Sequence, residues 1–276
     1  MSERPIQPSS VKAFGKELFE VIYEDGEFLV INKPAGLVCH PTKTDEFSSL
    51  ISRARLYLGP GAGIHLINRL DRETSGVVIV AKTDPAARTL RALWESRQVK
   101  KEYFAVVHGK VPETHKIITA RLGKDEQSAV AIKDCVRSDG SDAQTEFWVQ
   151  NTFEKDIPIA PIASRDSKES LPSRATRTFT CLKVVPQTGR KHQIRIHLAY
   201  IGHPIVGDKL YGGDETLYLA LVENRLAEEQ RSRLILQYHA LHAAKIRFVW
   251  NGRETVFRAE PEPWLKAFCS LASAHA

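Results

Sequence analysis

The segment Asn68–Gly76 places a carboxylate among arginines, in the order Asn-Arg-Leu-Asp-Arg-Glu-Thr-Ser-Gly. Asp71 stands in an expected turn before an apolar run, with Arg69 and Arg72 close to it in sequence. A neighbouring guanidinium lowers the pKa of a carboxyl group, so Asp71 is expected to be ionised at neutral pH. An ionised, positioned Asp can serve as a nucleophile or a base. By spacing alone, an Asp that caps the backbone N–H groups of a turn is the commoner structure.

A second candidate is the basic segment Thr188–His197. It contains Arg190, Lys191, His192, Gln193, Arg195 and His197 within eight residues. Contact with phosphate groups is the function that such a cluster favours, especially if a helix begins near it. A solvated basic face explains the composition equally well. His192 and His197 lack the H-E-x-x-H spacing, so we predict no metal site here.

Two further segments are less specific. Tyr103 begins an apolar run, and it could stack on a nucleobase or simply be a half-buried core residue. The glycines of Gly202–Gly213 match neither the dinucleotide-binding pattern nor the P-loop. We therefore predict a shaped loop there, without assigning it a function.

The elements that must position these segments mix strands and helices. Val21–Pro34 predicts two strands joined by a turn, and strands are also predicted at 77–81, 103–107, 145–149 and 178–185. Helices are predicted over 47–58, from Thr83 onwards, and over 194–201. Strands and helices do not alternate regularly, so we predict an α+β fold rather than a doubly wound sheet.

Two regions lack periodicity. Residues 1–17 are predicted to form a polar N-terminal tail, followed by one domain over residues 18–276. Residues 151–177 are rich in proline, serine and mixed charges, and they predict a surface insertion within that domain.

Composition places the chain among ordinary globular proteins. Its 276 residues are 42% hydrophobic and 26% charged, which excludes collagen-like, coiled-coil and fully disordered chains. The longest apolar run, Leu217–Val222, is far shorter than a membrane-spanning helix. A net charge of +6 is compatible with a polyanionic partner. The N-terminus lacks the apolar stretch of a secretory signal, and the four cysteines are widely spaced. These features predict a cytoplasmic protein with reduced thiols.

Five segments, in order along the chain, resemble the motifs of the RluA-type pseudouridine synthases. Asn68–Gly76 is similar to the catalytic motif of that family. The others are Leu29–Leu37 with His40-Pro41, Lys101–Gly109, Thr188–Leu198 continued by Gly202–Gly212, and Leu241–Ala243. Because five ordered motifs are hard to explain by coincidence, we assign Asp71 to catalysis rather than to a simple turn.

The resemblance implies isomerisation of uridine to pseudouridine in rRNA or tRNA, without a cofactor or metal. Asp71 would be the essential carboxylate, attacking the sugar or the base or removing a 2′ proton. Arg195 would pair with Asp71, and Tyr103 would stack on the uracil and assist proton removal at C5. Arg69 would help to hold the flipped nucleotide. The remaining RNA-binding residues that we predict are Arg72, Arg190, Lys191 and His192.

The resemblance also implies the pseudouridine synthase core, a mixed and largely antiparallel sheet with flanking helices. One departure is Asn68, which stands where the family usually has His. Another is length, because the roughly 20 residues before the first motif are too few for an S4-like RNA-binding module. We therefore expect the catalytic domain, with the 151–177 segment, to select the substrate. A monomer suffices for the chemistry.

Two other functions were weighed against this one. A catalytically silent RNA-binding protein of the same fold would lack Asp71, Tyr103 or Arg195, yet all three are present. A metal-dependent nucleic-acid hydrolase would need several converging His or carboxylate ligands, and the sequence offers no recognisable set.

Overall fold

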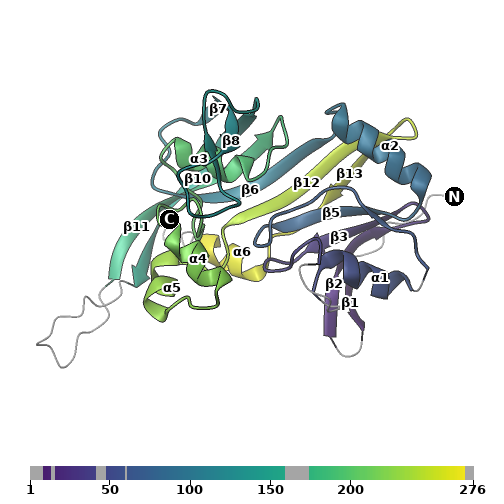
Figure 1. Ribbon diagram of the computed structural model, residues 1–276, viewed down its shortest axis with the longest axis horizontal. Helices are drawn as coiled ribbons and strands as arrows, with labels where there is room; N and C mark the ends of the chain where they lie inside the picture. Colours follow the sequence, from purple (N-terminus) through teal and green to yellow (C-terminus); the bar gives the residue numbers. More distant parts are fainter. Residues whose placement is uncertain (1–8, 14–15, 42–47, 60, 159–173, 271–276) are drawn as a thin grey trace, which may run out of the picture. The chain divides into compact units, whose positions relative to one another are not determined.

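The computed structural model describes residues 9–13, 16–41, 48–59, 61–158 and 174–270 (Figure 1). The chain forms two compact units, where the sequence predicted one domain. The first unit comprises residues 1–103 and 241–262, and the second comprises 104–240 and 263–276. The chain passes from the first unit to the second along strand β6 (Lys100–His108).

The first unit is built on a sheet whose strands run in the order β1-β2-β3-β5-β12. Two short strands extend it, because β4 pairs with β5 and β13 pairs with β12. The pairs are antiparallel except β12 with β5, which is parallel. The strands are β1 (Ser9–Ala13), β2 (Lys16–Glu24), β3 (Phe28–Lys33), β4 (His65–Leu66), β5 (Ser75–Ala81), β12 (Leu241–Trp250) and β13 (Arg253–Arg258).

Helices cover both faces of the central β3–β5 pair (Figure 1). Successive side chains of a strand point to opposite faces of the sheet. A strand that is apolar throughout must therefore be covered by other elements on both faces. Helix α1 (Leu50–Leu58) packs with Leu29 and Ile31 of β3 on one face. Helix α2 (Asp84–Glu95) packs with Phe28 and Val30 on the other. Thr83 Oγ1 accepts the Ala86 N–H at 3.3 Å and caps α2, as its sequence predicted.

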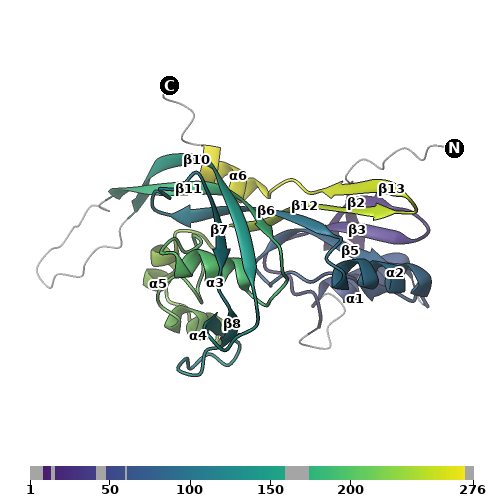
Figure 2. The same ribbon diagram turned by 90° about the horizontal axis from the view of Figure 1, so that it is seen from above.

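The second unit contains the strand order β6-β11-β10-β7 and a separate β8–β9 pair. Helix α6 lies beside β10 and β11 (Figure 2). The ring of Phe268 in α6 contacts the rings of Phe153 in β10 and Phe179 in β11. The strands are β7 (His115–Thr119), β8 (Leu122–Lys124), β9 (Asp134–Val136), β10 (Gln144–Pro158) and β11 (Arg174–Pro186). The helices are α3 (Gln193–Tyr200), α4 (Thr216–Val222), α5 (Glu228–Leu234) and α6 (Pro263–Ser270).

Two boundaries predicted from the sequence are wrong. Residues 9–13 form β1 rather than a loose tail, because backbone pairing with β2 orders them despite their polar composition. The 151–177 segment is largely strand at both ends, since β10 extends to Pro158 and β11 begins at Arg174. Phe153 and Ile157 are buried there, and charged residues lie between them. Such an arrangement suits a strand, but the overall composition of the segment does not reveal it. The predicted insertion at 159–173 lies outside the described residues.

Candidate active site

In the first unit, the loop that carries Asp71 is fastened to the loop that follows β3. Gly36 N–H donates to the carbonyl of Arg72 at 2.9 Å, and Arg72 Nε returns a bond to the carbonyl of Gly36 at 3.2 Å. The residue before Asp71 is held as well, because Leu70 N–H donates to Cys39 Sγ at 3.4 Å. Within the loop, Thr74 N–H donates to the carbonyl of Asp71 at 3.2 Å. The backbone on both sides of Asp71 is therefore fixed.

Lys33, the last residue of β3, supports this loop from the interior. Its side chain is fully buried, and its ammonium donates to the carbonyls of Pro34 and Leu37 at 2.8 Å and of Arg72 at 3.1 Å. Burial lowers the pKa of Lys33 to about 8, although negative neighbours that include Glu262 and Asp71 oppose that shift. The sequence analysis gave Lys33 no role. A lysine ending a strand of apolar residues was the signal that could have found it.

The other end of the loop is joined to β5 and β12. Asn68 accepts the Ile79 N–H at 2.8 Å and donates to the Val77 carbonyl at 3.0 Å, so its amide continues the backbone ladder. This pairing accounts for an amide at position 68. Gly76, with φ +113°, lies so close to β12 that a Cβ would meet the Ala243 carbonyl oxygen at 2.3 Å. Only glycine fits there, and three of the five motifs thus meet around one loop.

Tyr103 of β6 is half-buried and packs against the cluster that α1 covers. Burial raises the pKa of its phenol well above the ordinary value, and the negative charge of Asp71 raises it further. The phenol is therefore in its neutral form at pH 7, as in an ordinary tyrosine.

The burial of Lys33 leads to a pH-dependent prediction. Its folded pKa of about 8 lies below the value of about 10.4 for an unfolded lysine. Between these values the unfolded chain holds the proton that the folded protein has released, so stability rises with pH. From pH 7.5 to 9.5 the free energy of unfolding should gain about 2 kcal/mol from this group. Urea unfolding at both pH values should show the gain, and Lys33→Met should lack it.

An exposed lysine supplies the control for that comparison. Lys110→Met removes an ammonium from the surface and should keep the gain of the wild type. An equal gain in Lys33→Met would show that another group causes it.

In the second unit, Arg195 is held by a carboxylate that the sequence analysis had left within a loop of undefined function. Arg195 Nε donates to Asp208 Oδ2 at 2.7 Å, and Nη2 donates to Oδ1 at 2.9 Å. Both residues are buried, at 6% and 2% exposure. Burial alone would raise the pKa of Asp208, but the Arg195 guanidinium brings it well below the usual range. This fork-to-fork pair fixes the direction of the guanidinium.

The three basic residues before α3 follow one another on a turn at its N-terminus. Arg190 and Lys191 are exposed, and His192 is half-buried with a left-handed φ of 54°. Arg190 Nε donates to the Asp142 carbonyl at 3.1 Å, while Lys191 Nζ lies 3.0 Å from Asp134 Oδ1. The ammonium of Lys191 is partly exposed, so its ion pair with Asp134 is weak and can be exchanged for a phosphate contact. The helix predicted over 194–201 is confirmed as α3.

The predicted site residues fall into two sets. Asp71, Arg69, Arg72 and Tyr103 belong to the first unit, where Arg69 and Arg72 are exposed on the Asp71 loop. Arg190, Lys191, His192 and Arg195 belong to the second unit, at or before α3. The pairing of Arg195 with Asp71 would join residues of different units, and it stays a prediction.

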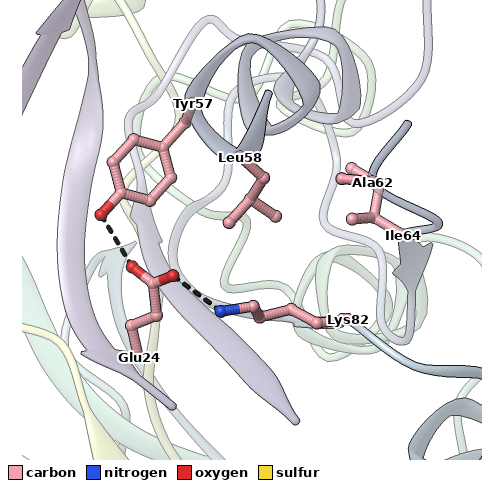
Figure 3. A pocket seen from close by; sticks show the side chains of 6 residues that line it. All are labelled: Glu24, Tyr57, Leu58, Ala62, Ile64 and Lys82. Carbon is pink, nitrogen blue, oxygen red and sulfur yellow. Dashed lines mark hydrogen bonds and ion pairs between the residues drawn. The ribbon is translucent and has the colours of Figure 1, made fainter. Parts of the chain in front are cut away.

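A pocket of about 450 Å³ lies elsewhere in the first unit (Figure 3). Lys82, which lines it, follows β5, whereas Asp71 precedes that strand, so the pocket is at the opposite end of β5. Leu58, Ala62 and Ile64 line it together with a polar cluster centred on Glu24. Glu24 accepts from Tyr57 Oη at 2.7 Å and from Lys82 Nζ at 2.8 Å. These polar groups satisfy one another, and none of the predicted site residues lines the pocket.

Three observations concern other kinds of site. Among the described residues, no group of three or more His, Cys, Asp or Glu side chains could hold a metal ion. None of the helices in the described ranges is long and apolar enough to cross a membrane. All four cysteines are free thiols, with Cys181 and Cys269 4.0 Å apart at their sulfurs.

The family described as RNA pseudouridylate synthase matches residues 27–200, more than half of the chain. The chain belongs to this family. RNA pseudouridylate synthases are isomerases, and the resemblance that the five motifs predicted is confirmed.

Relatives of the chain carry names that refer to different classes of RNA. Ribosomal large subunit pseudouridine synthase D of Xanthomonas campestris pv. campestris is 34% identical over 234 residues, which are 83% of this chain. The match covers 61% of the Xanthomonas protein, so the chain spans about three fifths of that relative's length. tRNA pseudouridine synthase C of Vibrio vulnificus is 30% identical over 256 residues, covering 91% of this chain and 94% of that protein.

A solved structure supports the fold. Human RNA pseudouridylate synthase domain containing 1 is similar with a TM-score of 0.63 and 24% identity, over 90% of this chain and 84% of that one. The α+β architecture expected for an RNA pseudouridylate synthase is thus confirmed, with mixed strand directions and helices that pack on the strands.

Proposed function

We propose that the protein isomerises specific uridines of structured RNA to pseudouridine, with Asp71 as the essential carboxylate. The observation that carries the proposal is the Asp71 loop, whose backbone is fastened on both sides to buried residues of the first unit. A carboxylate carried on a backbone held in this way reaches a substrate from a fixed position in the loop. In the reaction the N1–C1′ bond breaks, the uracil turns, and a C5–C1′ bond forms. The C5 proton leaves and N1 takes up a proton.

The neighbouring side chains have roles that their environments support. Tyr103 stacks on the uracil and assists removal of the C5 proton. Arg195 pairs with Asp71 and keeps it ionised, and Asp208 orients its guanidinium. Arg69 on the exposed loop helps to keep the target nucleotide out of its helix, since a stacked base hides its glycosidic bond.

The substrate is rRNA or tRNA, the two classes that the names of the relatives give. Arg72, Arg190, Lys191 and His192 contribute positive charge or donors that suit phosphate groups. The isomerisation changes no oxidation state and transfers no group to a second molecule, so it proceeds without a cofactor or metal. A monomer is sufficient, and the free, widely spaced cysteines fit a cytoplasmic enzyme.

Tritium release from RNA labelled at uridine C5 tests this function directly, since forming the C5–C1′ bond expels the C5 hydrogen. Unmodified rRNA and tRNA are supplied separately, each with wild type and Asp71→Ala. Release by the wild type alone identifies uridine isomerisation and the RNA class. RNA binding without release, from either pool or from partly assembled ribosomes, would instead identify a catalytically silent RNA-binding protein.

A further inference from the structure

Tyr211 packs against Arg195, the arginine that is proposed to pair with Asp71. The proposed reaction assigns no role to Tyr211 itself. The guanidinium carbon of Arg195 is 5.0 Å from the centroid of the Tyr211 ring. The face of an aromatic ring attracts a cation, most strongly where water is excluded, and Tyr211 is buried. Asp208 holds the edge of the same guanidinium through Nε and Nη2. Edge and face together leave the group little freedom to turn.

The hydroxyl of Tyr211 extends this arrangement to the turn before α3. Tyr211 Oη lies 2.9 Å from His192 Nδ1, and it accepts the Asp134 N–H at 3.3 Å. The carboxylate of the same Asp134 lies 3.0 Å from Lys191 Nζ. Lys191 and His192 are two of the three basic residues on that turn, which we call the 190–192 turn. One side chain therefore contacts Arg195 with its ring and the 190–192 turn with its hydroxyl.

We propose that Tyr211 is a positioning residue for Arg195, and that it couples RNA contact at the 190–192 turn to the orientation of the guanidinium. This inference rests on the proposed function, because it takes Arg195 to act in the reaction. Tyr211 acts mainly through Arg195, so its loss lowers the rate of the bound complex much more than it weakens RNA binding. An RNA phosphate that binds Lys191 would take it away from the Asp134 carboxylate. Because the Asp134 N–H donates to the Tyr211 hydroxyl, this change would also reach Tyr211.

Two variants separate the ring from the hydroxyl. Tyr211→Leu removes both, and we expect the single-turnover rate at saturating RNA to fall about 100-fold, as for a misplaced reacting group. Tyr211→Phe keeps the ring and should restore most of the rate, leaving a deficit of about threefold to tenfold for the lost hydrogen bonds. The dissociation constant for RNA should change far less than the rate in both variants. Tyr200→Leu, which removes an exposed tyrosine from α3, is the matched control and should keep the wild-type rate.

The coupling is measured with His192→Ala, alone and combined with Tyr211→Phe. If the hydroxyl links the two residues, His192→Ala lowers the single-turnover rate by about threefold or more in the wild type but not in Tyr211→Phe. Equal effects in both backgrounds would overturn the coupling.

Nuclear magnetic resonance of the free protein, labelled with ¹⁵N-arginine, measures how freely the Arg195 guanidinium rotates. The Arg195 Nε–H signal, assigned by its absence from Arg195→Met, should show slow rotation of the guanidinium in wild type and Tyr211→Phe, and faster rotation in Tyr211→Leu. A wild-type rate in Tyr211→Leu, or an unchanged Arg195 signal, would overturn the positioning role. Absence of tritium release by the wild type would instead refute the proposed function, and the Arg195 signal would still decide whether Tyr211 positions the guanidinium.

Discussion

Replacing Asp71 with alanine is expected to abolish uridine isomerisation, with a loss of at least about 10⁴-fold in the single-turnover rate. The replacement removes the carboxylate that is proposed to act on the reacting nucleotide as a nucleophile or base. The loop should survive, because the contacts that hold it are made by its backbone and by neighbouring side chains. These are the bonds from Gly36, Lys33 and Cys39 to residues 70 and 72. The variant should therefore bind RNA as the wild type does.

The measurement is tritium release under single-turnover conditions, beside a filter-binding titration of the same RNA. Asp84→Asn is the matched control, because Asp84 is an exposed carboxylate of the first unit at the start of α2. It should release tritium at the wild-type rate. Turnover by Asp71→Ala would show that another group supplies the essential carboxylate. Loss of RNA binding together with turnover would show that the loop depends on the Asp71 side chain.

Local patterns in the sequence predicted about half of the helices and strands that the structure describes. The capping threonine and early proline before α2 act within one helical turn, so their effect does not depend on the rest of the fold. The apolar run of β5 likewise predicts a buried strand wherever it lies. Strand β1 was missed because its order comes from backbone pairing with β2, which side-chain patterning does not reveal.

The candidate site was predicted through motif resemblance, and its supporting contacts were not. Spacing alone favoured a simple turn at Asp71, since nothing local distinguishes a catalytic Asp from a capping one. Lys33 is separated from the Arg72 carbonyl by 39 positions, and Asp208 from Arg195 by 13. Such pairs depend on how strands and loops are brought together. A buried charge in the sequence indicates that a partner exists without showing which residue it is.

Replacing Arg195 with methionine should cost both stability and activity. The Asp208 side chain is fully buried, so the variant leaves a carboxylate without its cation, at a cost of about 3–5 kcal/mol in the free energy of unfolding. In the wild type the pKa of Asp208 is held low by Arg195, after burial alone would have raised it. In Arg195→Met no guanidinium opposes the effect of burial, so the pKa of Asp208 is higher in the folded protein than in the unfolded chain. Asp208 therefore takes up a proton more readily when the protein is folded. The stability deficit should therefore shrink as the pH falls from 7 to 4, which urea unfolding would measure.

A second substitution separates the two costs. Asp208→Asn removes the buried charge but keeps an oxygen for the Leu210 and Tyr211 N–H groups, which lie 2.9 and 3.0 Å from Oδ1. In Arg195→Met/Asp208→Asn we expect the free energy of unfolding to return to within about 1 kcal/mol of the wild type, as in other replaced buried ion pairs. Tritium release should stay as low as in Arg195→Met, since the guanidinium is still absent. A double variant that regained both would show that Arg195 serves the fold alone. A double variant that regained stability without activity would show that the fold does not need the buried Arg195–Asp208 pair. The pair would then serve the reaction, because Asp208 holds the Arg195 guanidinium in place.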